Sequence, residues 1–133
     1  FDHNIDKYYN EGVKYIEQGW LKESIEKFDK AIELDPVFAM AYANRGYAYK
    51  ALEQYQRAIE DFDEAIELDP SDADAYRERG FAYRGRRQYQ RAIEDFDKAI
   101  ELVRTSLMST TTGGFPTMYW AILSRAERTT TRP

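Results

Sequence analysis

The sequence contains no cysteine, and this absence excludes several kinds of chemistry. Disulfides, thiolate catalysis and cysteine metal sites are ruled out, while the redox compartment stays open. Histidine occurs once, as His3 at the start of the chain, and no glycine-rich loop of the kind that cradles phosphate is present. We therefore predict that the chain is not an enzyme and that it holds no metal and no cofactor.

Long apolar runs and an excess of positive charge are also missing. The longest apolar run, MYWAIL at 118–123, is far too short to cross a bilayer. The net charge is −5, so most of the surface would repel a phosphate backbone. We expect neither a membrane nor nucleic acid as partner, and a cytoplasmic location. Because the chain begins at Phe1 without Met, we also expect a fragment or a processed product.

Two stretches of the chain are nearly identical. QYQRAIEDFDEAIEL at 54–68 returns as QYQRAIEDFDKAIEL at 88–102, and only Glu64 and Lys98 differ. The two stretches start 34 residues apart, and a third, weaker copy precedes them at the same spacing. A period of 34 residues is typical of stacked helical repeats, in which no single helix pair can bury its apolar face. The rings and small residues that recur are Tyr8, Gly12, Tyr15, Phe28 and Ala31, then Tyr42, Gly46, Tyr49, Phe62 and Ala65, then Tyr76, Gly80, Tyr83, Phe96 and Ala99.

Each copy divides into two amphipathic helices, because apolar residues recur at three- and four-residue spacing on both sides of a break. Asp69–Pro70 should end the second helix of one copy. Asp72 should accept hydrogen bonds from the free N–H groups of the next helix. We predict helices near 5–17, 21–34, 38–51, 55–68, 72–85 and 89–105.

Small and acidic residues at the repeat period lead to two further expectations. Gly46 sits in mid-helix, where glycine costs about 1 kcal/mol relative to alanine, so we expect close helix approach there with Ala58 and Ala92 on the other side of such contacts. The acidic pairs Glu60–Asp61 and Glu94–Asp95 recur on a polar helix face. This pattern predicts solvated surface rather than acid–base chemistry.

The order Tyr42-x2-Arg45-Gly46-x2-Tyr49, followed by Ala58-x3-Phe62, Ala65 and Pro70, resembles the tetratricopeptide repeat. The other two copies match it too, with Ser24 in place of the first Ala and Arg104 where Pro is usual. The resemblance covers residues 5–104 and implies an all-α, right-handed α-solenoid of three helix-turn-helix repeats, at 5–38, 39–72 and 73–106. The fold is a scaffold, so the resemblance says less about function.

The resemblance also implies a concave groove lined by the first helix of each repeat, which binds a peptide segment of a partner protein. Val13, Tyr47 and Phe81 should form an apolar stripe along it, and Asn44 matches the family's asparagine that holds the ligand backbone. Basic residues beside the stripe indicate a partner with apolar and acidic residues. The alternative is that these rings pack sideways against the next helix. The expected groove residues are Tyr9, Asn10, Val13, Asn44, Tyr47, Lys50, Arg77, Phe81 and Arg84.

Several relatives in the family bind a C-terminal carboxylate through Lys, Asn, Asn, Lys and Arg. The matching residues here are Tyr9, Val13, Asn44, Asp74 and Glu78, so four of the five differ and two reverse the charge. The resemblance therefore disfavours an adaptor for Hsp70 or Hsp90 tails. The alternative function is a structural unit that self-assembles through its groove or its ends.

The composition changes after Arg104. All eight threonines lie at residue 105 or later, and the stretch 107–133 reads as a Thr-rich linker followed by a short helix from about Thr117. The apolar segment Met118–Leu123 needs a place to bury. We expect it either to cap the last repeat or to occupy a groove, of this chain or of a neighbour, which would make the chain a homo-oligomer through its tail. The cap is favoured.

Overall fold

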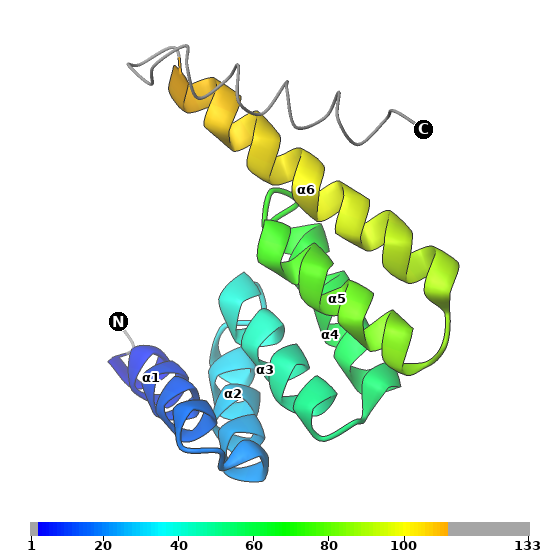
Figure 1. Cartoon of the computed structure of the whole chain (residues 1–133). Coiled ribbons are helices and arrows are strands. Elements are labelled where there is room, and N and C mark those ends of the chain that lie inside the picture. The colour runs from blue at the N-terminus through cyan, green and yellow to red at the C-terminus, as the bar shows by residue number, and fades with distance from the viewer. Residues whose placement is uncertain (1–2, 112–133) are drawn as a thin grey trace, which may run out of the picture.

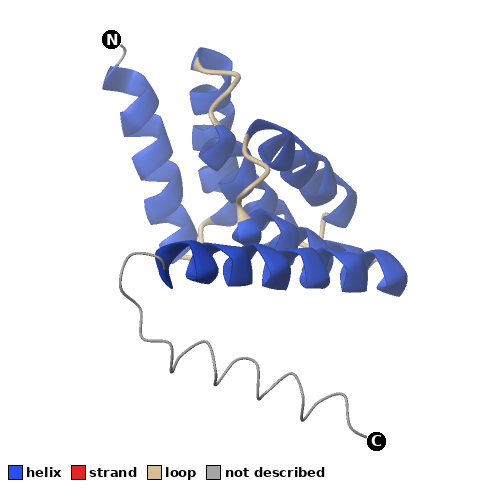
Figure 2. Cartoon of the chain, turned by 90° about the horizontal axis from the view of Figure 1, so that it is seen from above, coloured by secondary structure: helices blue, strands red, loops and turns tan. Residues whose placement is uncertain are grey.

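The computed structural model describes residues 3–111, which form six α-helices joined by short loops (Figures 1 and 2). No strand occurs within this range. None of the helices described there combines the length and the apolar character that crossing a bilayer requires. The helices are α1 (His3–Glu17), α2 (Leu21–Leu34), α3 (Ala39–Ala51), α4 (Tyr55–Leu68), α5 (Ala73–Gly85) and α6 (Tyr89–Thr111).

The helix bounds agree with the sequence prediction to within two residues except at the C-terminal end. There α6 continues to Thr111, past the predicted end at 105 and past Met108, to which Val103, Leu107 and Met108 indicate an extension, so the predicted linker from residue 107 begins as helix. Asp72 caps α5 as predicted, and its carboxylate accepts hydrogen bonds from the N–H groups of Asp74 at 3.0 Å and Ala75 at 3.3 Å. The short helix expected after Thr117, and the tail-mediated oligomer, lie outside the described residues.

Each helix pair turns through one residue with left-handed backbone geometry. Gly19 has φ +81°, Glu53 has φ 62° and Arg87 has φ 63°. The turn in the second pair is closed by hydrogen bonds from the N–H of Glu53 to the Lys50 carbonyl and from the N–H of Gln54 to the Tyr49 carbonyl. Left-handed geometry is unfavourable for residues with a Cβ, so only the first of the three turns has a residue suited to it.

We expect Glu53→Gly and Arg87→Gly each to raise the free energy of unfolding by roughly 0.5–1 kcal/mol, because glycine removes the left-handed penalty but loses more chain entropy on folding. Urea unfolding measures the gain. Glu53→Ala is the matched control and should gain nothing, since alanine keeps the Cβ. A gain equal to that of the glycine variant would mean that the Glu53 side chain, and not its backbone, is unfavourable.

The two helices of each repeat pack through a glycine facing a phenylalanine. A Cβ built on Gly46 would stand 2.9 Å from the nearest ring atom of Phe62, and one on Gly12 would stand 2.6 Å from Phe28. The close approach predicted from the glycines is therefore present, but the prediction that alanines form its other side is wrong. Ala58 instead lies in a core cluster with Ala82 of the next repeat, because its side chain faces across the boundary between repeats.

Successive repeats stack in one direction, with the second helix of one repeat against the first helix of the next (Figure 1). Among the first helices of the repeats, α1 also contacts α3, and α3 contacts α5. In a curved stack the elements on the inner side lie closest together. The surface formed by α1, α3 and α5 is therefore the inner, concave side of the array.

Candidate functional site

A ladder of ion pairs runs between the repeats. The Arg45 guanidinium donates two hydrogen bonds to the Asp61 carboxylate, at 2.8 Å and 2.7 Å, and a third to Asp29 of the preceding repeat at 2.8 Å. Asp61 is only 5% exposed. The prediction that the acidic pair containing Asp61 is solvated surface is therefore wrong for this residue, since its carboxylate is buried against an arginine on the neighbouring helix.

The third repeat contains the same arrangement, and the first repeat contains it with the charges exchanged. Arg79 donates to Asp95 at 2.8 Å and 2.7 Å and to Asp63 at 2.9 Å. Asp95, which was also expected to be solvated, is likewise 5% exposed. At the equivalent positions of the first repeat, Glu11 pairs with Lys27 at 3.6 Å. The charge recurrence at one repeat position was the sequence signal that could have revealed this ladder.

The ladder shifts the pKa values of its members. The hydrogen bond to Asp61 raises the pKa of Arg45 above its ordinary value, against the effect of burial, and the bond to Asp95 does the same for Arg79. Burial raises the pKa of the Asp61 carboxyl, and the hydrogen bonds from Arg45 oppose that rise. Each carboxylate of the ladder is paired with an arginine or, for Glu11, with a lysine, so none of these carboxylates is free to transfer a proton.

A second cluster lies on the concave surface, around the ring of Phe81. The Lys50 ammonium stands 5.1 Å and the Arg84 guanidinium 4.9 Å from the centroid of this ring. The same ammonium stands 4.8 Å from the centroid of Tyr47. Tyr47 is 40% exposed and Phe81 is half-buried, so both rings are accessible as predicted. Four of the predicted groove residues thus form one cationic–aromatic surface.

The cations of this surface differ in how firmly they are held. Lys50 forms an ion pair with Glu78 on the facing helix, and both side chains are largely buried. Arg77 pairs with Asp74 at 3.1 Å, but both of these side chains are exposed, so solvent weakens that pair. Arg84 is exposed beside Phe81. The two arginines are therefore the cations that an acidic ligand can reach at least cost.

The predicted groove residues of the first repeat lie in a different environment. The Asn44 amide donates to the Tyr9 hydroxyl at 2.9 Å and to the Met40 carbonyl at 3.0 Å. Tyr9 and Val13 are partly buried and pack against the core cluster that contains Phe28. Burial raises the pKa of the Tyr9 hydroxyl, and the bond from Asn44 opposes the rise. Asn10 is exposed on the same helix. At this end, part of the predicted stripe contributes to the core.

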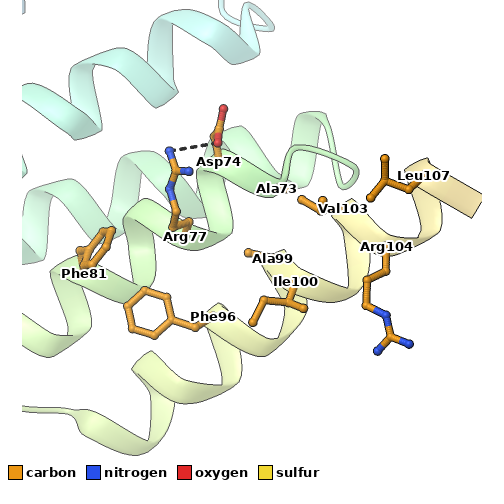
Figure 3. Close-up of a pocket in the computed structure, with 10 residues that line it drawn as sticks. All are labelled: Ala73, Asp74, Arg77, Phe81, Phe96, Ala99, Ile100, Val103, Arg104 and Leu107. Carbon is orange, nitrogen blue, oxygen red and sulfur yellow. Dashed lines mark ion pairs between the residues drawn. The ribbon is translucent and has the colours of Figure 1, made fainter. Parts of the chain in front are cut away.

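A pocket of about 570 Å³ opens between α5 and α6 at the C-terminal end of this surface (Figure 3). Phe81 and Phe96 lie at one end of it, with ring centroids 5.0 Å apart, and Leu107 lies at the other. Its floor is formed by Ala99, Ile100 and Val103 of α6. Sequence reasoning placed Arg77 and Phe81 in the groove but did not foresee that α6 contributes to the same cavity.

These stacked helix pairs have repeated Gly–Phe contacts, and their first helices form a concave surface. They define a helical repeat array. The family model described as Tetratricopeptide repeat matches residues 39–72 and 73–105, and a second model, described as TPR repeat, matches residues 12–52. The chain therefore belongs to the tetratricopeptide repeat family. No curated protein sequence gives a significant match.

Several solved structures are similar. The first TPR of Spaghetti (RPAP3), bound to the HSP90 peptide SRMEEVD, has 28% identity and a TM-score of 0.74, over 77% of this chain and 81% of that one. The TPR2B domain of yeast Sti1, in a complex with pHsp70, has 25% identity and a TM-score of 0.76, over 84% and 90%. MamA has 28% identity and a TM-score of 0.74, over 78% and 61%.

Proposed function

We propose that this chain is a protein-interaction module that holds a peptide segment with apolar and acidic residues along the concave surface of α1, α3 and α5. The observation that carries the proposal is that the Lys50 ammonium and the Arg84 guanidinium both lie over the ring of Phe81, and that the same ammonium lies over the exposed ring of Tyr47. Rings of this kind anchor apolar side chains, and the flanking cations attract acidic ones. Similar TPR domains in solved structures hold peptides of HSP90 and HSP70, which supports a peptide as the ligand class.

The ligand is an internal segment rather than a free C-terminus. Asp74 and Glu78 stand at two of the positions where the family's carboxylate-binding domains have cations, and Glu78 is bound to Lys50. The Asn44 amide is held by Tyr9 and the Met40 carbonyl. A terminal carboxylate would meet like charge here, so it adds nothing to affinity.

We expect peptides selected from a random display library to be enriched in apolar and acidic residues. The strongest selected peptide should bind a Tyr47→Ala, Phe81→Ala variant at least about tenfold more weakly, which corresponds to roughly 1.4 kcal/mol. Fluorescence polarisation measures this. Tyr89→Ala is the matched control, because it removes an exposed ring that does not line the pocket around Phe81, and it should leave binding unchanged.

Two results would contradict the proposal. One is a set of selected peptides without apolar residues. The other is equal binding by wild type and the double variant while circular dichroism shows both folded. Amidating the C-terminus of the selected peptide tests the ligand class separately, and a large loss of affinity would show that a terminal carboxylate is recognised after all.

A further inference from the structure

The outer face of α6 is apolar and open where the equivalent face of α4 is covered. Ile59 in α4 is 4% exposed, whereas its counterpart Ile93 in α6 is 52% exposed. Ile100 and Val103 on the same helix are 57% and 50% exposed. In the second repeat, α5 lies over this face. The face of α6, with the pocket of Figure 3, is therefore shaped as the seat of one more first helix.

The two existing boundaries between repeats, α2 against α3 and α4 against α5, show which residues such a helix needs. Ala41 and Ala75 are fully buried small residues at the two existing boundaries, and Ala41 packs with Phe28 and Ala31 of the preceding helix. Four residues after each alanine comes the arginine that reaches back to the preceding repeat, Arg45 to Asp29 in one case and Arg79 to Asp63 in the other. The equivalent acid on α6 is Asp97, which is exposed.

A second copy of this chain does not meet these requirements at its N-terminal end. The residues of α1 that correspond to the buried alanine and the arginine are Lys7 and Glu11. Docking α1 of another copy would bury a lysine against Phe96 and place Glu11 opposite Asp97. Burying a charge and opposing two carboxylates both cost free energy, so end-to-end stacking of copies is disfavoured.

The chain itself contains a matching segment beyond the described residues. PTMYWAILSRA at 116–126 repeats the spacing of PVFAMAYANRG at 36–46 and PSDADAYRERG at 70–80, with Pro, Ala, Arg and then a small residue at the same intervals. The glycine of the earlier copies is Ala126 here.

We propose that residues 116–126 dock on the exposed face of α6 in the position that the first helix of a fourth repeat would take, with Ala121 against Phe96 and Ala99 and with Arg125 paired to Asp97. The connection is long enough. α6 extends nine residues past Leu102, the counterpart of the last residue of α4, which is about 14 Å of helix. Residues 112–117 span up to about 20 Å, which covers this return and the sideways step to a neighbouring helix.

The absence of cysteine provides the test, since Ala121→Cys introduces a single thiol in the full-length chain. A docked segment buries this thiol as Ala41 and Ala75 are buried, so we expect it to react with a thiol reagent at least about tenfold more slowly than the thiol of Thr130→Cys. Adding Asp97→Arg should abolish the protection, and adding Arg125→Asp to that variant should restore it. Glu94→Arg, which reverses another exposed acid of α6, should change nothing.

Equal reaction rates for the two single-thiol proteins overturn the proposal. Protection that survives Asp97→Arg overturns the register. Protection that increases with protein concentration would mean that the segment docks on a second copy, and it would also overturn the intramolecular seat. Circular dichroism of each variant confirms that repeats one to three remain folded, so that a loss of protection reports on the segment alone.

Discussion

Phe62→Ala should lower the free energy of unfolding by about 3–5 kcal/mol, which is the usual cost of removing a fully buried aromatic ring. Phe62 is 1% exposed, and it packs with Ala58 and Ile59 of its own helix and Ala82 of the next repeat. The ring therefore joins two repeats as well as two helices. Urea unfolding at constant m-value measures the loss. Tyr47→Ala, which removes an exposed ring from the same repeat, should cost less than about 1 kcal/mol.

Phe62 gives a sharper test when Gly46, the glycine that faces its ring, is changed as well. Gly46→Ala should destabilise the wild-type chain, because its new methyl group would stand 2.9 Å from the Phe62 ring. In the Phe62→Ala background that ring is gone, and the same change should stabilise by up to about 1 kcal/mol through helix propensity. An effect of the same sign in both backgrounds would show that Phe62 does not set the space at Gly46.

Arg45→Ala should cost about 3 kcal/mol, because it leaves the buried Asp61 carboxylate without its bidentate partner. We place the loss at the lower end of the range for buried pairs, since the Arg45 side chain keeps 20% of its exposure. The cost should depend on pH. Without the arginine, the pKa of Asp61 rises further above its unfolded value, so the folded state binds a proton more readily than the unfolded state.

The sign of this dependence is fixed by that difference in proton binding. The loss in free energy of unfolding caused by Arg45→Ala is largest at neutral pH. It shrinks as the pH falls through the raised pKa of Asp61, because a protonated carboxyl needs no cation. Chemical denaturation of the wild type and the variant at pH 7 and pH 5 measures this loss. Replacing both partners, by Arg45→Met with Asp61→Leu, should recover most of the loss. A deficit that is equal at both pH values would mean that the lost packing of the arginine stem, and not the charge, matters.

Much of the fold followed from the sequence because the repeat states the same packing rule three times. The period located the helices, and mid-helix glycines such as Gly46 indicated close approach. The partner of Gly46 was misassigned to alanine because a helix face shows which residues are buried but not which of them lie opposite each other. Asp61 was misread for the same reason, since its partner Arg45 lies on another helix.

The candidate site was less accessible to sequence reasoning than the fold. Tyr47, Lys50, Phe81 and Arg84 come together as the tier pattern indicated, because equivalent positions on parallel first helices must align. Tyr9 was predicted to line the groove, but the structure also gives it a place against the core and a bond from Asn44. A residue with two roles cannot be recognised from its position in the repeat alone.

The ion-pair ladder makes the length of the array adjustable. Arg45 and Arg79 each pair with one acid of their own repeat and one of the repeat before. If a copy of residues 46–79 were inserted after Arg79, each arginine of the longer chain would still have both of these acids as partners. No such insertion is open before the first repeat, where Glu11 would face the acid of a preceding unit. Gene duplication can therefore lengthen this chain internally in steps of one unit, and each step adds one more tier of concave surface without any new mutation.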